Sequence, residues 1–470
     1  NTTVSDRNAV LTQTSDANLI DEIMYGDADG NEQIDMNDVI STRKYITSFD
    51  YDLGTSNVTV EAGADANGDG KINMKDIVLL RKYIVNYDYE TGSSTVTLGP
   101  SHIPVDIPAV EPTCTTTGLT KGSKCSICGK ILIPQQTVPV KDHSFGSGVL
   151  NGDKLMYTCS VCNYTKSENA FVVTVKHLKI DGSEAHAQTV VGFPLNADPY
   201  KVEALNISGL VPSHDYVMLD YTSSATTVTI YYSQIDVWDG SSVSSSLKGS
   251  GTASDPYLIQ SGADLAYIDK NMTAAENFKG VYFKMTKSID LNGKSVKIGY
   301  YPGWSGRIIF NGIFDGNNCS IRNLNMTDSG KGGGLFSVVS GTVKNLTVYG
   351  TVSGNDKMVG GITGWLYKGT LENCSSYVNV TSTGDSETGG LVGTSEGGTI
   401  IKCTNYGSVT GKDSVGGIAG KASGTMTSCR NYGKVSGNSN VNDIYGAAHS
   451  SGTPILSDCG VENEFFISDG

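Results

Sequence analysis

The chain has 470 residues and a formal net charge of −14, and only 17% of its residues are charged. Glycine occupies 57 positions, or 12%, against about 7% in average proteins. This composition excludes a coiled coil and an ordinary α/β enzyme core, and it favours many short strands and turns. No apolar stretch approaches the roughly 20 residues of a membrane-spanning helix. The chain begins at Asn1 without an initiator Met or a signal peptide, so we expect a processed or recombinant start.

The negative charge is concentrated in the first 90 residues, which hold 17 acidic and 7 basic side chains. An acidic segment of this kind argues against nucleic acid as a partner, and it indicates bound cations.

An acidic loop occurs twice in this segment. Its first copy comprises Asp27, Asp29, Asn31, Gln33, Asp35 and Asp38, and its second copy comprises Asp65, Asn67, Asp69, Lys71, Asn73 and Asp76. Oxygen-bearing side chains stand at loop positions 1, 3, 5, 9 and 12, and position 7 can offer its carbonyl oxygen. This spacing predicts two calcium sites. Each loop leads into a predicted helix, over Val39–Ile46 and Ile77–Ile84.

The two copies lie 38 residues apart and share the tetrapeptide Arg-Lys-Tyr-Ile. Residues 1–92 resemble the dockerin module of cellulosome-type assemblies, with Asp38 and Asp76 in place of the final Glu of an EF-hand. The resemblance implies two Ca²⁺ ions and a cohesin module of a scaffold protein as the partner. It assigns partner contacts to Met36, Asn37, Arg43, Lys44, Met74, Lys75, Arg81 and Lys82. Glu32 replaces the usual Gly at position 6, so we expect a strained or weaker first site.

A cysteine-rich piece, residues 113–168, follows a Ser/Thr/Pro-rich linker at 93–112. Two knuckles, Cys125 with Cys128 and Cys159 with Cys162, predict one Zn²⁺ held by four thiolates. An alternative set of Cys114, Cys125, Cys128 and His143 stays open, and so do disulfides. The stretch from Thr113 resembles the zinc-ribbon-like repeats of surface proteins from anaerobic bacteria, which implies a spacer.

Residues 169–236 contain alternating strand patterns and resemble β-grasp repeats of the mucin-binding-protein type, which implies another spacer. A Ser-rich second linker is expected at 237–248.

The remaining residues, 249–470, repeat at intervals of 27, 29 and 27. A Gly-Gly pair followed by an apolar pair marks each copy, at Gly333, Gly360, Gly389 and Gly416, with a degenerate fifth copy from Tyr445. A short period with β-type segments predicts a solenoid, here a right-handed parallel β-helix. Cys374, Cys403 and Cys429, with Cys459 next, recur at the position of Leu324 and Leu346, which predicts an interior column. The fold class is therefore multidomain and mostly β, with a small α-helical calcium module.

This last region resembles the GLUG-motif family of surface β-helices, which implies adhesion or binding more often than catalysis. Candidate glycan contacts are Tyr300, Tyr301, Trp304, Trp365 and Tyr367. The acids Asp290, Asp315, Asp328, Asp356, Asp385, Glu387, Glu396 and Asp413 fall mostly in predicted turns and form no evident catalytic pair. We therefore expect a secreted, non-catalytic or accessory part of a polysaccharide-degrading complex, at the cell surface or outside it. The alternative is a dockerin-borne polysaccharide lyase or glycoside hydrolase.

Overall fold

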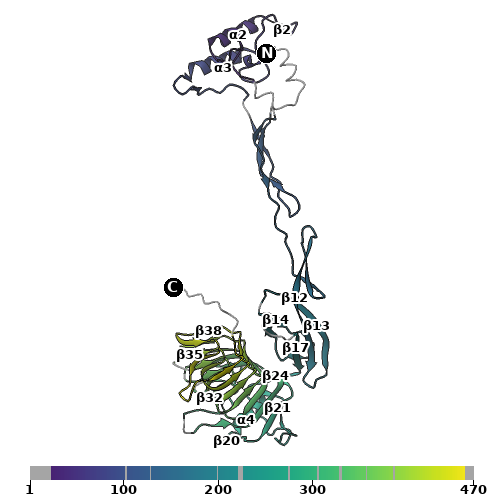
Figure 1. The fold of residues 1–470 in the computed structure, drawn as a ribbon, viewed down its shortest axis with the longest axis vertical. Coiled ribbons are helices and arrows are strands. Elements are labelled where there is room, and N and C mark those ends of the chain that lie inside the picture. The colour runs from purple at the N-terminus through teal and green to yellow at the C-terminus, as the bar shows by residue number, and fades with distance from the viewer. Residues whose placement is uncertain are drawn as a thin grey trace. The chain divides into compact units, whose positions relative to one another are not determined.

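The computed structural model describes residues 23–100, 103–126, 129–197, 199–220, 226–273, 276–303, 306–327, 331–355, 357–384 and 387–460. The chain is mostly β with few helices, as predicted (Figure 1). It divides into two compact units, residues 1–147 with 157–165 and residues 148–156 with 166–470.

Two helices form the centre of the first unit, α2 (Met36–Thr47) and α3 (Met74–Val85). Each begins with a capping box, in which Asp35 or Asn73 accepts from the backbone and the acid three residues later caps in return. The helices bury a small apolar cluster made of Val39, Ala66, Ile77 and Leu80. The calcium loops therefore end directly at helix N-termini, as the sequence predicts.

The 38-residue repeat continues beyond the helices into two small hairpins. Strand β1 (Phe49–Asp50) pairs with β2 (Thr55–Ser56), and β3 (Tyr87–Asp88) pairs with β4 (Ser93–Ser94). Leu98 packs against the apolar cluster between the helices. The segment expected to be a linker at 93–112 thus begins with a strand of this repeat.

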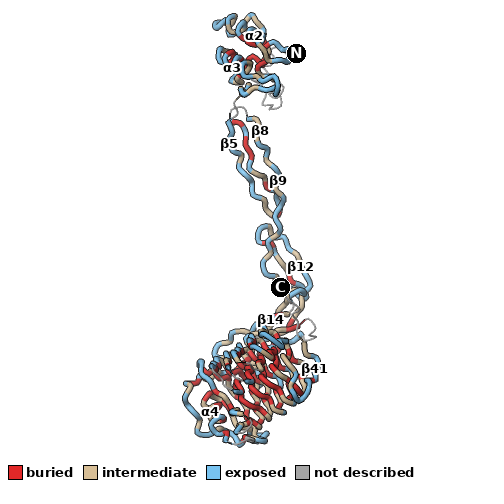
Figure 2. Tube along the Cα trace, turned by 90° about the vertical axis from the view of Figure 1, so that its left-hand side faces the viewer, coloured by how far each residue is buried: buried red, intermediate tan, exposed pale blue. Residues whose placement is uncertain are grey.

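Short strands fill the rest of the first unit. Strands β5 (Pro104–Ile107), β7 (Gly122–Cys125) and β8 (Ile131–Ile133) form one sheet, and β6 (Gly118–Leu119) pairs with β9 (Thr137–Val138). Figure 2 shows this segment largely exposed or intermediate. No apolar core cluster among the described residues includes a side chain from residues 103–165.

The second unit begins with a mixed six-stranded sheet. Its order is β10 (Val149–Asn151), β11 (Lys154–Thr158), β12 (Thr165–Lys179), β17 (Thr227–Ser233) and β15 (Val211–Pro212), with β13 (Glu184–Pro194) paired to β12. Strands β12 and β17 run parallel, and a hairpin of β14 (Tyr200–Glu203) and β16 (Tyr216–Leu219) lies beside them.

A β-solenoid forms the rest of this unit, which confirms the predicted parallel β-helix (Figure 1). Its strands are β18 (Ile235–Val237), β19 (Tyr257–Ile259), β20 (Glu276–Asn277), β21 (Tyr282–Met285), β22 (Ser288–Asp290), β23 (Ile309–Phe310), β24 (Ile313–Met326), β25 (Phe336–Val339), β26 (Thr342–Gly354), β27 (Val359–Gly360), β28 (Thr363–Tyr367), β29 (Thr370–Glu372), β30 (Ser375–Ser382), β31 (Thr388–Gly389), β32 (Val392–Ile401), β33 (Thr404–Asn405), β34 (Val409–Thr410), β35 (Asp413–Gly416), β36 (Ala419–Thr427), β37 (Arg430–Asn431), β38 (Val435–Ser436), β39 (Ser439–Asn442), β40 (Tyr445–Ala448) and β41 (Ile455–Ser457). Figure 2 shows the buried residues gathered inside the stacked coils.

Three of the four Gly-Gly pairs stack in register, because Gly360 pairs with Gly389 and Gly389 pairs with Gly416, whereas Gly333 pairs with Val359. A Cβ at Gly389 would overlap the carbonyl oxygen of Val392, so only glycine fits this corner. The fifth copy is shifted from the predicted frame, since Asn442 rather than Tyr445 pairs with Gly416.

Inside the solenoid, one column contains Cys319, Leu346, Cys374, Cys403, Cys429 and Cys459. The predicted cysteine column is present, but Cys319 holds the place assigned to Leu324. Irregular pairing within β24 shifts Leu324 opposite Gly350. The column is almost fully buried, as expected of a small apolar side chain.

One helix, α4 (Gly262–Lys270), lies against the first coils and buries Leu265 and Ile268 in the solenoid core. The stretch 237–248, expected to be a linker, packs against the same core, because Trp238 is buried in it and Leu247 contacts it.

Candidate functional sites

The first acidic loop turns its carboxylates toward its own backbone N–H groups. Asp27 accepts from Gly30 at 2.7 Å and from Glu32 at 3.0 Å, and Asp38 accepts from Ala28 and Asp35, both at 2.7 Å. Oxygens of Asp27, Asp29 and Asp38 lie within 4.8 Å of one another. This arrangement fits a hard divalent cation that prefers oxygen ligands.

The second loop repeats the same contacts. Asp65 accepts from Asp69 at 3.2 Å and from Gly70 at 2.7 Å, and Asp76 accepts from Asn67 at 3.2 Å and Asn73 at 2.7 Å. Burial raises the pKa of Asp65 to about 6, and it raises the pKa of Asp38 and of Asp76. A bound cation would offset this cost of burying carboxylates.

The remaining predicted ligand positions lie on the same loops. Asn31 accepts from the Gln33 N–H at 2.8 Å, and the Lys71 carbonyl accepts from the Asn73 side chain at 3.1 Å. Glu32 has a φ of 65° where the second loop has Gly70 at 85°. A left-handed conformation is costly for Glu, so the first loop carries the backbone strain that the sequence predicts.

All eight predicted partner contacts lie exposed on α2 and α3, namely Met36, Asn37, Arg43, Lys44, Met74, Lys75, Arg81 and Lys82. The structure adds Ile40 and Val78, which occupy equivalent places on the two helices and are 46% and 48% exposed. This pair was not predicted from the sequence, although the equal spacing of Ile40 and Val78 after each loop is visible in the repeat. Each helix therefore presents the same kinds of apolar and basic side chains to solvent.

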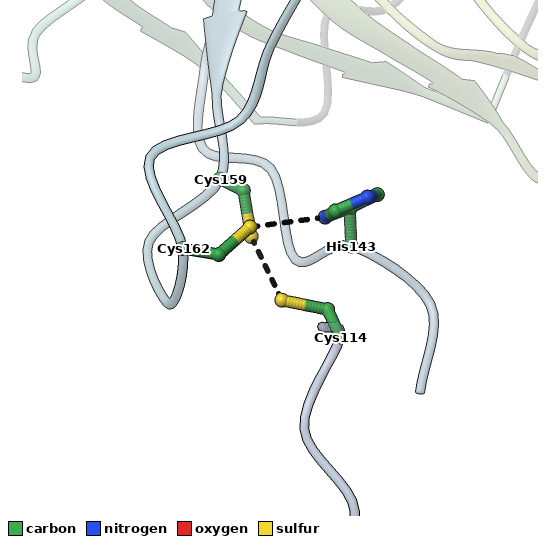
Figure 3. Close-up of side chains that lie close together, drawn as sticks. All are labelled: Cys114, His143, Cys159 and Cys162. Atoms are coloured by element: carbon green, nitrogen blue, oxygen red, sulfur yellow. Dashed lines mark hydrogen bonds between the residues drawn. The ribbon is translucent and has the colours of Figure 1, made fainter. Parts of the chain in front are cut away.

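The cysteine-rich piece brings together a set that differs from both predicted zinc sets. Cys114, His143, Cys159 and Cys162 each offer one ligand atom, and these four atoms lie within 4.8 Å of one another (Figure 3). Cys125 lies in β7 and does not belong to this cluster, and Cys128 lies outside the described residues. The predicted four-cysteine set is corrected, because Cys159 and Cys162 meet Cys114 and His143 instead of Cys125.

The cluster is held by a tight turn and an aromatic contact. The Cys159 N–H donates to the Tyr164 carbonyl at 2.8 Å, and the Asn163 N–H donates to the Cys159 carbonyl at 3.0 Å. The His143 ring stacks on Tyr164 with centroids 4.5 Å apart. Backbone N–H donation, chiefly from Val161, lowers the pKa of the Cys159 thiol to about 6.

The aromatic glycan candidates of the solenoid are only partly exposed. Tyr301, Trp365 and Tyr367 form one cluster, in which Trp365 is 2% exposed and lies 5.2 Å from the Tyr301 ring. Trp365 therefore offers no open ring face, contrary to its expected role. Tyr300 is 52% exposed, and Trp304 lies outside the described residues.

Acids of the solenoid bond to neighbours on adjacent coils. Asp290 accepts from Asn323, Asp315 accepts from Asn345, and Glu387 accepts from Lys421. The hydroxyl of Ser439 donates to Asp413 and lowers the pKa of this acid to about 2. The candidates Asp328, Asp356 and Asp385 lie outside the described residues. Asp290, Asp315, Glu387 and Asp413 thus link neighbouring coils.

Four stacked tyrosines, Tyr349, Tyr377, Tyr406 and Tyr432, line the side of the solenoid that faces the hairpin of β14 and β16. Arg322 donates to both carboxylate oxygens of Asp215, and Arg430 donates to Asp220 at 3.0 Å. This contact between the mixed sheet and the solenoid was not predicted from the sequence. The sequence feature that could have revealed this contact is a tyrosine that recurs every 26 to 29 residues.

Residues 25–85 match the family described as "Dockerin type I domain". This part of the chain is a dockerin domain, and domains of this family bind calcium. The match covers the two loops and both helices, α2 and α3, described above.

Two curated proteins are similar to parts of the chain. One is "Halomucin" of Haloquadratum walsbyi, 28% identical over 236 residues, which are 47% of this chain and 2% of that protein. The other is a "Putative Gly-rich membrane protein" of Evansella cellulosilytica, 34% identical over 138 residues, which are 27% of this chain and 15% of that protein. The chain thus matches only a small part of either relative.

One solved structure is similar, described as a "putative immunoglobulin A1 protease" from Bacteroides ovatus. The two are 21% identical with a TM-score of 0.34, over 45% of this chain and 77% of that one.

Among the helices that the structure describes, none is both long and apolar enough to cross a membrane.

Proposed function

We propose that the chain is a secreted, non-catalytic or accessory component of a polysaccharide-degrading complex. Its dockerin domain attaches it to a cohesin module of a scaffold protein, and its solenoid binds glycan or a cell surface. The observation that carries the attachment is the dockerin match at residues 25–85, together with the two equivalent exposed helix faces.

Calcium supports this attachment through the two loops. One ion would be held by Asp27, Asp29 and Asp38, and the other by Asp65, Asn67, Asp69 and Asp76. Backbone carbonyl oxygens would complete each site. Because Asp38 and Asp76 also cap α2 and α3, an ion in each loop would fix the start of a partner-facing helix. Binding of cohesin should therefore depend on calcium.

The test is binding of the intact chain to immobilised cohesin modules with calcium and with a chelator. We expect binding only with calcium, and we expect Asp38→Ala/Asp76→Ala, which removes a carboxylate from both loops, to weaken it strongly. Lys248→Ala/Lys294→Ala, a basic pair from outside the dockerin domain, should bind as the unchanged chain does. Binding that is equally strong in chelator would contradict the proposal.

The observation that supports the solenoid role is exposed Tyr300 beside Tyr301, which offers an aromatic face of the kind that stacks on sugars. A glycan array probed with the intact chain and with Tyr300→Ala tests it. Tyr51→Ala, which removes an 84% exposed tyrosine from the first unit, is the matched control. Polysaccharide cleavage lost on substitution of a single solenoid acid would instead support the lyase or hydrolase alternative.

A further inference from the structure

Three thiols and one imidazole converge in the first unit, and we infer that Cys114, His143, Cys159 and Cys162 bind one structural zinc ion. Zinc–sulfur bonds of about 2.3 Å at tetrahedral angles separate two sulfur ligands by about 3.8 Å, and a zinc–nitrogen bond of about 2.0 Å gives a sulfur–nitrogen separation of about 3.5 Å. The Cys114 and Cys159 sulfurs are 3.8 Å apart, and the Cys162 sulfur is 3.3 Å from Nδ1 of His143 (Figure 3). These two separations are close to those of a zinc coordination shell, and all four ligand atoms lie within 4.8 Å of one another.

The donor set identifies the metal and its role. Three thiolates and one imidazole form one of the ligand sets of structural zinc, and sulfur donors disfavour calcium and magnesium. With four protein ligands the coordination shell is closed, so no position is left for a catalytic water. A disulfide would use two of the three thiols and leave the third thiol and His143 without a common role.

The turn around Cys159 and Cys162 has the shape that such a site needs. Hydrogen bonds from Asn163 to Cys159 and from Cys159 to Tyr164 close the turn, and Asn163 takes a φ of 59° to complete it. Stacking on Tyr164 fixes the plane of the His143 ring. Both features orient ligands before any ion binds, as contacts around metal ligands commonly do.

The described part of the surrounding segment contributes to no apolar core cluster. None of the described side chains from residues 103–165 joins an apolar core cluster, whereas Cys114 and Cys159 are buried. Its strands are two to five residues long up to β11. Small segments without a core commonly depend on a metal. Here the ion would join three separate stretches of chain, at Cys114, at His143 and at the Cys159 turn.

Zinc content and X-ray absorption of the intact chain, purified without chelators and from zinc-supplemented medium, test this site. We expect a shell of three sulfurs and one nitrogen. We expect this shell to be lost in Cys114→Ser and in His143→Ala, and kept in Cys125→Ser and in the control Cys459→Ser. His143→Cys should still bind zinc, with four sulfurs, which separates loss of a ligand from loss of folding.

Two results would overturn the inference. One is a chain without zinc whose Cys159 or Cys162 is found in a disulfide by mass spectrometry. The other is zinc that survives in both Cys114→Ser and His143→Ala but is lost in Cys125→Ser, which would restore the four-cysteine set predicted from the sequence. Calcium in the dockerin loops does not interfere, because zinc is measured separately.

Discussion

Tyr377 and Tyr406 lie face to face on neighbouring coils of the solenoid, with ring centroids 4.3 Å apart and planes 5° apart. Tyr216 of β16 meets both rings edge-on, at 5.2 and 5.5 Å. Offset stacking and edge contacts are the favourable geometries of aromatic pairs. The stacked column therefore attaches the mixed sheet to the solenoid within the second unit.

Tyr406→Ala should lower the free energy of unfolding of the second unit by about 2 to 3 kcal/mol, because it removes the ring that touches Tyr377, Tyr216 and Tyr432 at once. Chemical denaturation followed by tyrosine fluorescence measures this loss. Tyr300→Ala, at an exposed tyrosine outside the stack, is the control and should change stability little. Equal stability of the two variants would show that the stack does not stabilise the unit.

His214 gives this contact a dependence on pH. Its ring bonds to Ser213 and Ser375 and lies near Arg322 and Asp215, and burial lowers its pKa to about 4. The folded chain thus keeps His214 neutral while the unfolded chain protonates it near pH 6.5. The contribution of His214 to the stability of the second unit should therefore be fully present above pH 6.5, and it should be lost as the pH drops from 6.5 toward 4.

The expected loss between pH 7 and pH 5 is about 1 to 2 kcal/mol for the second unit. His214→Asn keeps a polar side chain but does not titrate, so this variant should lose much less stability over the same range. Denaturant midpoints measured at both pH values give the answer. Identical pH dependence of the two proteins would exclude His214 as the cause.

Glu32→Gly should strengthen the first calcium site and stabilise the dockerin domain by about 1 kcal/mol, because glycine adopts the φ of 65° without strain. The matched change in the second loop is Gly70→Glu, which should weaken its site by a similar amount. Calcium titration of the intact chain by calorimetry compares both variants. A weaker first site in Glu32→Gly would show that the Glu32 side chain itself supports binding.

Removal of calcium should unfold α2 and α3 while the solenoid stays folded. The loops hold buried carboxylates, and the helices bury only small apolar clusters, so the ions should supply much of the folding free energy. Hydrogen exchange on the intact chain with and without chelator checks this. Peptides from 36–47 and 74–85 should lose protection, and peptides from β32 should keep it. Protection of the helices that persists in chelator would contradict the expectation.

Short local patterns made much of this architecture predictable. The calcium loops could be found because both place oxygen-bearing side chains at positions 1, 3, 5, 9 and 12, from Asp27 to Asp38 and from Asp65 to Asp76. The Gly-Gly corners could be found because the clash that a Cβ would cause at Gly360, Gly389 and Gly416 keeps glycine at each of these positions. Helix α4 was missed, although Ser261 and Asp264 form a capping box before the apolar Leu265 and Ile268.

Other features depend on contacts between distant residues. The hairpin strands β1 to β4 have two residues each, too few to show an alternating pattern. The Cys/His cluster brings Cys114 together with Cys159, which lies 45 positions later in the chain. The paired Cys-x2-Cys spacing in the sequence instead favours Cys125 as a zinc ligand. Trp365 is an aromatic residue of the kind that stacks on sugars. Its burial becomes visible only from its packing against Tyr301.

Our proposal is that the dockerin domain attaches the chain to cohesin through either of two equivalent helices. Its most direct test is the affinity for cohesin of four proteins in calcium: the unchanged chain, Arg43→Ala/Lys44→Ala, Arg81→Ala/Lys82→Ala and the variant that combines both pairs. We expect each pair alone to change the affinity little, because the other helix still presents its contacts, and we expect the combined variant not to bind. Loss of binding from the Arg43/Lys44 change alone, or unchanged binding by the combined variant, would contradict it.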